Sequence, residues 1–254
     1  MSDPRVVVLP SAEGRAIDLL AGPGAAHVVV GPHMGAQHRT MCVLEFEPGS
    51  ATRTLRHPSE AVWYVVSGHG VALRESADPL SLEPGAMVHV APAATYALRS
   101  ADTEKLVLVG GPAPPDPGLG RAEDALADSG GEVRLFHRDR PSRRLPMISS
   151  DARLVVWPGV GAYTANMNYV RLEPGEENRP HSHPVSEDTI VILSGRGSVD
   201  DLTNGESHEF QAGDVIHIPI GLEHRVKADR GEGVVSVGGP CPPDTAMLAV
   251  AEQA

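Results

Sequence analysis

The sequence predicts an all-β chain built from two copies of one unit. Its 254 residues include 27 glycines and 23 prolines. So many turn-forming residues favour short strands joined by turns over a helical bundle. Aromatic residues make up only 4% of the chain, so we expect valine, leucine, isoleucine and alanine to fill the core. A chain of this length can bury a good core as one domain or as two.

An internal repeat favours two domains. Val109–Asp116 reads VGGPAPPD, and Val237–Asp244 reads VGGPCPPD. The tripeptide Glu47–Gly49 likewise recurs as Glu173–Gly175, each time at the end of a strand-like segment. The offset between the copies drifts only from 126 to 128 residues. Small loop insertions therefore separate two copies of one structural unit.

The boundary between the two units is predicted from composition. Pro112–Gly131 is rich in proline and glycine around a short Ala/Asp/Glu stretch, and we place the linker there. The expected domains are residues 1–119 and 120–254. Short helices are expected at the end of each unit, at Arg121–Asp128 and Thr245–Glu252.

The second copy carries a set of side chains typical of a metal site. His181 and His183 are two residues apart, so on a β-strand both would project from one face. Asp188 follows, and His224 comes after Gly213–Gly221, which reads as a strand and a tight turn. Ligands on three neighbouring strands of a barrel would converge on one point. Three imidazoles and a carboxylate are a suitable ligand set for a divalent transition metal.

Two spacing patterns around these residues resemble the motifs of the cupins. The first runs from Gly175 to Gly195 as G-x5-H-x-H-x4-D-x6-G, and the second from Gly213 to His224 as G-x5-P-x-G-x2-H. This resemblance implies a small antiparallel jelly-roll barrel with a metal inside it, and the repeat then implies two tandem barrels, a bicupin. The metal positions of the family carry over onto His181, His183, Asp188 and His224. The family usually has glutamate where this chain has aspartate.

The first copy lacks most of this ligand set. Where the second copy has two histidines, an aspartate and a third histidine, the first has Leu55, His57, Ala61 and Tyr96. One imidazole beside leucine and alanine cannot hold a divalent ion well. We therefore expect a metal-free N-terminal barrel that packs against the second, with His57 hydrogen-bonded in the interior or at the rim.

Two adjacent carboxylates compete for the fourth ligand position. Glu187 and Asp188 would point to opposite faces of a strand, and the acid of the family lies seven residues before the motif glycine, which selects Asp188. The first copy keeps Glu60 at the other position although its metal ligands are gone, so Glu187 resembles a structural or surface residue. Aspartate is one methylene shorter than glutamate. The site could therefore be effectively three-histidine, with Asp188 accepting a hydrogen bond from water or an imidazole.

Catalytic candidates other than the ligands are weak. Arg179 shares strand parity with the two motif histidines and could bind a substrate carboxylate, although a solvated rim position is the commoner role of such an arginine. Asn166, Asn168 and Tyr169 precede the motif and could line the pocket. If the reaction needs a general base, Tyr169 and Glu187 are the candidates. We assign no role to His217.

The ligand types suit several metals and three classes of function. One divalent transition metal per chain is expected, with Fe2+ or Mn2+ favoured and Ni2+, Cu2+ or Zn2+ possible. Open coordination positions would let a small-molecule substrate meet dioxygen or water. We favour a dioxygenase acting on a small enolisable or aromatic compound. The alternatives are a non-redox lyase, isomerase or decarboxylase, and a small-molecule binding or sensor protein without catalysis.

Charge and cysteine content restrict partners and location. The net charge of −12 argues against nucleic acid or an anionic membrane as a partner. The apolar run Val6–Leu9 is too short for a signal peptide or a membrane span. Two cysteines, Cys42 and Cys241, provide no disulfide framework. We expect a cytoplasmic location and a homodimer.

Overall fold

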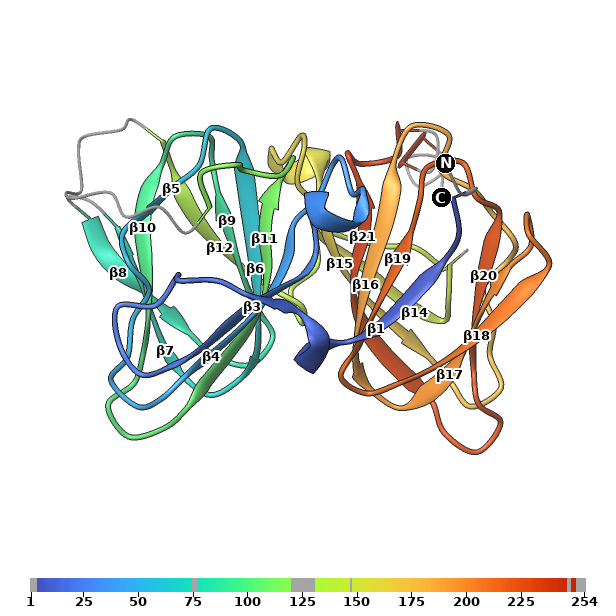
Figure 1. Cartoon of the computed structure of the whole chain (residues 1–254), viewed down its shortest axis with the longest axis horizontal. Helices are drawn as coiled ribbons and strands as arrows, with labels where there is room; N and C mark the ends of the chain where they lie inside the picture. The colour runs from blue at the N-terminus through green and yellow to red at the C-terminus, as the bar shows by residue number, and fades with distance from the viewer. Residues whose placement is uncertain (1–3, 75–76, 120–130, 147, 246–247, 250–254) are drawn as a thin grey trace.

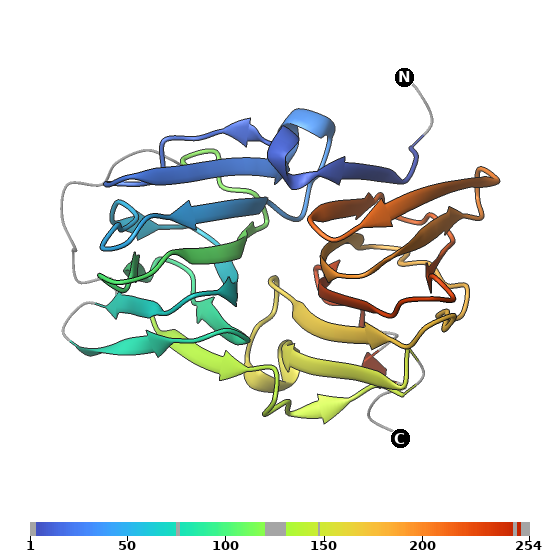
Figure 2. The same ribbon diagram turned by 90° about the horizontal axis from the view of Figure 1, so that it is seen from below.

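The chain folds into two β-barrels that lie side by side (Figures 1 and 2). The structure is a computed structural model, and it describes residues 4–74, 77–119, 131–146, 148–245 and 248–249. Every strand pairing in its four sheets is antiparallel. The predicted all-β class with two tandem barrels is confirmed.

Each barrel is made of one seven-stranded sheet and one smaller sheet. The larger N-terminal sheet has the order β12 (Val133–His137), β9 (Ala86–Val90), β6 (Glu60–Ser67), β11 (Leu106–Ala113), β4 (Met41–Phe46), β3 (Gly24–Val30) and β2 (Arg15–Ala16). The smaller N-terminal sheet has the order β5 (Leu55–Arg56), β10 (Thr95–Ser100), β7 (Gly70–Arg74) and β8 (Ala77–Leu82).

The C-terminal barrel repeats this plan. Its larger sheet has the order β1 (Val7–Pro10), β19 (Asp214–Ile218), β16 (Glu187–Ser194), β21 (Val234–Cys241), β15 (Met167–Leu172), β14 (Asp151–Val156) and β13 (Arg143–Arg144). Its smaller sheet has the order β18 (Glu206–Gln211), β17 (Arg196–Asp201) and β20 (His224–Ala228).

Helical structure among the assigned elements is limited to three short 3-10 turns. These turns are η1 (Ser11–Glu13), η2 (Pro32–Met34) and η3 (Pro158–Val160). The helix expected at Arg121–Asp128 lies outside the described residues, and so does most of the one expected at Thr245–Glu252. In the part of the chain that the structure describes, no helix combines the length and apolar character needed to span a bilayer.

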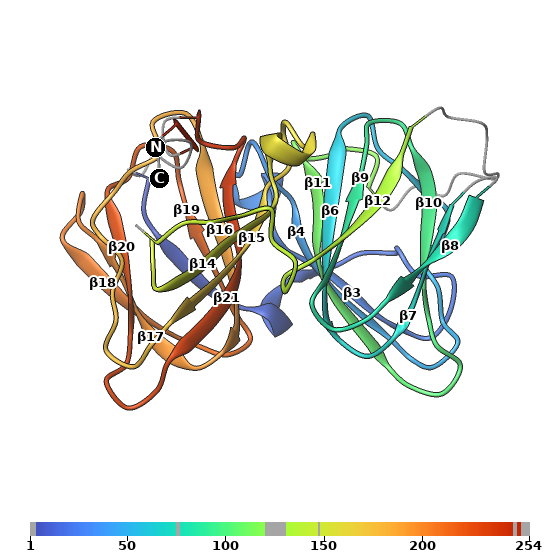
Figure 3. The same ribbon diagram turned by 180° about the vertical axis from the view of Figure 1, so that it is seen from behind.

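The two large sheets exchange a strand. β1 comes from the start of the chain and pairs with β19 of the C-terminal barrel, from Val7 opposite His217 to Pro10 opposite Asp214. β12 follows the predicted linker but pairs with β9 of the N-terminal barrel (Figure 3). The division predicted between residues 119 and 120 therefore does not follow the sheets. One strand from before it joins the C-terminal sheet, and one strand from after it joins the N-terminal sheet.

The strands at the centre of the molecule are buried on both faces. On β6, Trp63 belongs to the core inside the N-terminal barrel, whereas Val62 and Tyr64 belong to a second core between the barrels. On β16, Ile192 faces the interior of the C-terminal barrel and Val191 faces the same inter-barrel core. Side chains alternate between the faces of a strand, so this arrangement gives the chain three apolar layers and buries the barrel junction.

The repeated glycine pair is required by close strand packing. Gly238 has φ +146°, and a Cβ at this position would lie 2.0 Å from the carbonyl oxygen of Thr189. In the first half, Gly110 has φ +145°, and its Cβ would lie 2.0 Å from the carbonyl oxygen of Val62. Any side chain would push β21 off β16, or β11 off β6. The glycines thus fix the strand that forms one wall of the candidate site.

Candidate metal site

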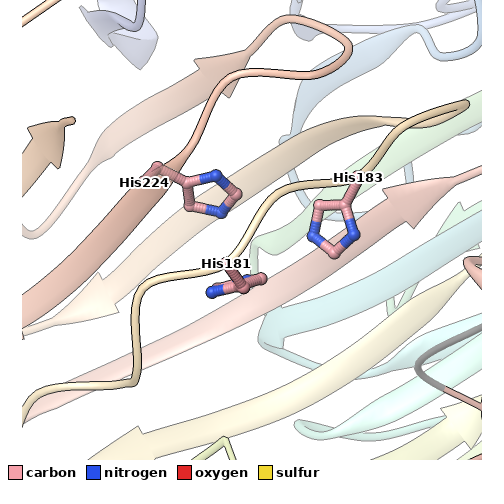
Figure 4. A group of neighbouring side chains, drawn as sticks. All are labelled: His181, His183 and His224. Carbon is pink, nitrogen blue, oxygen red and sulfur yellow. The ribbon is translucent and has the colours of Figure 1, made fainter. Parts of the chain in front are cut away.

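The side chains of His181, His183 and His224 lie close together in the C-terminal half of the chain (Figure 4). His181 and His183 lie in the segment before β16, and His224 is the first residue of β20. The prediction that the first two lie on a strand is wrong. Only His181 forms an isolated β-bridge, with His224. Pro180 and Pro184 flank the motif and cannot donate to a strand ladder.

The imidazoles are close enough to share one ion. One ring nitrogen from each of His181, His183 and His224 lies within 4.8 Å of the others. The ring centroids of His181 and His224 are 4.3 Å apart, and that of His183 is 5.1 Å and 5.5 Å from them. His183 and His224 are buried, and His181 is half-buried. Three nitrogen donors in this arrangement could hold a divalent metal ion.

Backbone hydrogen bonds set the tautomer of two of these histidines. Nδ1 of His181 lies 2.8 Å from the carbonyl oxygen of Arg179, and Nδ1 of His224 lies 3.0 Å from that of Leu222. A carbonyl oxygen only accepts, so each Nδ1 carries the proton in the neutral ring. The lone pair is then on Nε2, which is the atom available to a metal.

A carboxylate orients the third histidine in the same way. Nδ1 of His183 donates to Oδ2 of Asp244 over 2.7 Å, and both residues are buried. In the N-terminal barrel, Nδ1 of His57 lies 2.9 Å from Oδ2 of Asp116. Each aspartate ends one copy of the repeated VGGPxPPD segment. Sequence reasoning missed the role of Asp244, although the repeat contained the signal.

The atoms that face the shared space have no partner of their own. Nε2 of His183, Nε2 of His224 and Oδ1 of Asp188 are buried without a hydrogen-bond partner. Each such group costs about 1–3 kcal/mol. A cation held by the imidazoles would give both Nε2 atoms a partner, so the histidines present fit a metal.

Burial also favours the neutral, metal-binding form of these rings. It lowers the pKa of His181 below its ordinary value. Burial, together with the neighbouring His181, lowers the pKa of His224 to about 4. Near pH 7 both imidazoles are therefore neutral, and no proton has to leave before a metal binds.

Glu187 and Asp188 point to opposite sides of β16, as the sequence predicted. Oδ2 of Asp188 lies 3.8 Å from Nε2 of His183, inside the barrel. The carboxylate of Glu187 instead accepts three backbone N–H bonds of 2.8–2.9 Å from Gln37–Arg39, a loop of the N-terminal barrel. Glu187 ties the two barrels together and does not face the histidines. Metal ligation by Asp188 stays a prediction.

Glu60 makes the reciprocal connection. Its carboxylate accepts backbone N–H bonds of 2.6–3.0 Å from Tyr163–Ala165, a loop of the C-terminal half. Burial alone would raise the pKa of Glu60, but the His89 side chain, 3.5 Å away, and the backbone N–H groups lower it to about 2. The pair Glu60 and Glu187 therefore joins the barrels by a pseudo-symmetric exchange of buried, charged hydrogen bonds.

A small cavity of about 60 Å³ opens beside His181, His183 and Asp188. Asn168, Ser236 and Asn178 supply polar groups to its lining, and no lysine or arginine is among the described residues that line it. The apolar side chains of the lining are Ile148, Val170, Leu172, Ile190, Val226 and Pro240. Oδ1 of Asn168 is buried and has no hydrogen-bond partner. The cavity is small and mainly apolar, and the only charged side chains in the described part of its lining are among the candidate ligands.

The remaining sequence candidates lie away from the imidazoles. The side chain of Arg179 is exposed. Tyr169 packs in the inter-barrel core, where the guanidinium groups of Arg138 and Arg153 lie 5.4 Å and 4.8 Å from its ring centre. The side chain of Asn166 donates to the carbonyl oxygen of Pro240 and is not part of the cavity lining. Of the three residues expected before the motif, only Asn168 lines the cavity.

In the N-terminal barrel, a hydrogen-bonded network occupies the corresponding place. Nε2 of His57 lies 2.8 Å from the hydroxyl of Tyr96, which also accepts a 2.8 Å bond from Nε1 of Trp63. Leu55 pairs with Tyr96, as His181 does with His224. His57 is 2% exposed, so the prediction of a hydrogen-bonded interior histidine is confirmed. The three-histidine group is the one metal-like cluster found within the described residues.

Comparison with known proteins matches part of the chain to a known family. Residues 168–239 match the cupin domain family. A germin-like protein of Arabidopsis thaliana, subfamily T member 2, is 35% identical over 78 residues, which is 30% of this chain and 36% of that protein. Oxalate oxidase GF-3.8 of Triticum aestivum is 32% identical over 81 residues, with the same coverage. The match thus spans little more than a third of either relative.

Solved structures resemble the whole two-barrel chain. Protein YlbA of E. coli superposes with a TM-score of 0.73 at 16% identity, over 96% of this chain and 94% of that chain. An oxalate decarboxylase of Lactobacillus farciminis, solved as a formate complex, superposes with a TM-score of 0.72 at 15% identity, over 96% and 87%. At these identities the likeness shows the fold alone.

Proposed function

We propose that this chain, a two-barrel protein of the cupin superfamily, is a metal-dependent enzyme and specifically a dioxygenase for a small enolisable compound. One observation carries the proposal. The Nε2 atoms of His183 and His224 are buried and unpartnered, and His181 and His183 line a cavity. A closed structural site would surround its ion with protein ligands, whereas a catalytic site keeps positions open for substrate.

The histidines would hold Fe2+ or Mn2+, with Asp188 beside them. When bound, such a metal would accept an oxygen donor of the substrate and make dioxygen reactive at a neighbouring position. The protein supplies the orientation of the ligands. Arg179, Leu222 and Asp244 fix the ring orientations through the Nδ1 hydrogen bonds.

The lining of the cavity selects the kind of substrate. Oδ1 of Asn168 offers an unpartnered acceptor that suits an enol hydroxyl. Ser236 adds a group that can donate or accept. The valine, leucine and isoleucine walls exclude water, which strengthens polar contacts inside the site. A cavity of about 60 Å³ favours a compact diketone or short enolisable acid over a flavonol.

The absence of the two sequence-predicted base candidates from the cavity lining favours the oxygenase. Tyr169 and Glu187, the base candidates from the sequence, face the inter-barrel core and a neighbouring loop. The second candidate function is a non-redox lyase or decarboxylase, and Asp188 favours it. Its buried, unpartnered Oδ1 could take a proton from the substrate. Relatives and fold neighbours include an oxalate oxidase and an oxalate decarboxylase, which supports a small acid in either case.

Oxygen consumption tests the proposal. Iron- or manganese-loaded protein is assayed with acetylacetone, catechol, a flavonol and oxalate, with and without air. We expect oxygen uptake with a compact enolisable compound and its loss in His183→Ala. The exposed His33 provides a matched control, since His33→Ala should keep full activity. Equal turnover without oxygen would establish the non-redox alternative. Metal-loaded protein without turnover would favour a binding protein. A homodimer remains a prediction.

A further inference from the structure

Arg39 is a fully buried arginine without a carboxylate partner. It belongs to the N-terminal barrel, yet its guanidinium group reaches into the C-terminal one. Nη1 lies 2.7 Å from the carbonyl oxygen of Asn166, 3.4 Å from that of Gly239 and 3.3 Å from Sγ of Cys241. No ion pair joins its side chain to an acid among the described residues, and Nε has no hydrogen-bond partner.

Such an arrangement is costly for stability. Removing a guanidinium group from water carries a penalty of several kcal/mol, and an apolar side chain of similar volume is often no less stable in its place. Packing alone therefore does not account for an arginine here. The desolvation penalty of Arg39 indicates that its hydrogen bonds to the C-terminal barrel have a role other than stability.

The pseudo-symmetry of the molecule shows that the arginine is specific to one barrel. Glu187 binds the N–H groups of Gln37–Arg39, and Glu60 binds those of Tyr163–Ala165. Ala165 is therefore the counterpart of Arg39. The arginine is on the loop that faces the barrel with histidine at three ligand positions, and the alanine is on the loop that faces the barrel with histidine at only one of them. The asymmetry follows the metal-ligand set.

One of the groups that Arg39 contacts, Gly239, belongs to a wall of the cavity, and the others lie behind that wall. Gly239 and Pro240 line it directly. Asn166 donates its side-chain amide to the carbonyl oxygen of Pro240, and Asn168, two residues further, lines the cavity. The packing here is tight, because a Cβ on Gly239 would lie 3.0 Å from Nδ2 of Asn168. The guanidinium group thus joins the start of β15 to the end of β21 behind the wall.

We propose that Arg39 is a positioning residue of the candidate site. By holding the Asn166 and Gly239 carbonyl groups together, it fixes the wall segment and presents Asn168 to the bound small molecule. The N-terminal barrel, which lacks the ligand set, thereby contributes to the site of its neighbour. The inference rests on the proposed function only in taking this cavity as the substrate site.

A methionine substitution tests the role. Arg39→Met removes the donors but keeps most of the volume and strands no buried acid. In Co2+-loaded protein, followed by absorption, we expect acetylacetone to bind at least tenfold more weakly than in the wild type. The affinity for Co2+ should stay within twofold, because none of the three histidines contacts Arg39. Arg39→Lys should recover part of the acetylacetone binding, since a lysine still donates to carbonyl groups.

Arg134 offers a matched control. It also donates to two backbone carbonyl groups of the C-terminal half, those of Val160 and Gly161, but these residues do not line the cavity. Arg134→Met should leave acetylacetone binding unchanged. If it weakened binding as much as Arg39→Met does, or if Arg39→Met lowered the melting temperature without changing binding, Arg39 would be merely structural.

NMR of the metal-free protein separates this proposal from the proposed function. In Arg39→Met, the side-chain amide signals of Asn166 and Asn168 and the backbone amide of Gly239 should shift or broaden. Signals of the N-terminal barrel interior, such as the indole of Trp63, should stay in place. This result would support the positioning role of Arg39 even if the wild type bound neither Co2+ nor acetylacetone. Unchanged Asn168 signals would overturn it.

Discussion

His183 donates a buried 2.7 Å hydrogen bond from Nδ1 to the carboxylate of Asp244. The N-terminal barrel keeps the same pair as His57 and Asp116 at 2.9 Å, but there Nε2 of the histidine bonds to Tyr96. The histidine–aspartate pair is therefore part of the duplicated unit. What differs between the barrels is the group that Nε2 meets.

Removing Asp244 should weaken metal binding without removing a ligand. Asp244→Ala leaves Nδ1 of His183 without its acceptor, so the ring loses its fixed orientation. We expect a loss of metal affinity of about 10- to 100-fold, measured by competition with a chelator. Asp116→Ala removes the equivalent carboxylate from the other barrel and should leave the affinity unchanged. Equal affinities in wild type and Asp244→Ala would contradict this role.

Replacing His224 by tyrosine should replace the metal site with a histidine–tyrosine hydrogen bond like that of the N-terminal barrel. In that barrel the Tyr96 hydroxyl hydrogen-bonds to Nε2 of His57, so a tyrosine at 224 can satisfy His183. We predict that His224→Tyr folds with a melting temperature near that of the wild type but loses stoichiometric metal. Metal analysis after dialysis checks the second point. Retention of one ion per chain would show that His224 is not a ligand.

Lengthening Asp188 tests whether its carboxylate reaches the metal. Two neighbouring ligands about 2.1 Å from one ion lie roughly 3.0 Å apart in an octahedral site and roughly 3.4 Å apart in a tetrahedral one, whereas Oδ2 of Asp188 is 3.8 Å from Nε2 of His183. Asp188→Glu should close this gap and raise metal affinity about tenfold, while Asp188→Asn should lower it only slightly. Isothermal titration calorimetry gives both values. If Asp188→Glu binds more weakly and Asp188→Asn does not bind, the aspartate is already a full ligand.

The contact that Glu60 makes between the barrels should make the free energy of unfolding depend on pH. The pKa of Glu60 is about 2 in the folded chain, below its ordinary 4.5. Its contribution is therefore complete above pH 4.5 and is lost as the pH falls towards 2. Between pH 6 and pH 3, the contribution of Glu60 to the free energy of unfolding falls by an amount on the order of 2 kcal/mol. Urea unfolding at pH 6 and pH 3 should show a smaller acid-induced loss in Glu60→Gln than in the wild type.

Much of the fold could be predicted because its signals are local. Turn glycines, strand alternation and the repeated VGGPxPPD segment each depend on a few neighbouring residues. The exchange of β1 and β12 could not be predicted, because it depends on pairings such as that of Val7 with His217. Nothing in a four-residue apolar strand specifies which barrel it joins.

In the candidate site too, local features could be predicted from the sequence and long-range contacts could not. The positions of His181, His183 and His224 followed from spacing, and the three residues do come together. The first two histidines lie outside a regular strand because Pro180 and Pro184, on either side of them, cannot donate to a strand ladder. The role of Glu187 could not be predicted, since its partners lie about 150 residues away in a loop of the other barrel. Arg39 escaped notice for the same reason.

Anomalous diffraction from a crystal grown with Co2+ tests the central claim most directly. We predict one strong peak per chain, in contact with Nε2 of His181, His183 and His224, and no peak beside His57 and Tyr96. A peak in the N-terminal barrel, or an ion bound at the surface with the three imidazoles left empty, would contradict the account.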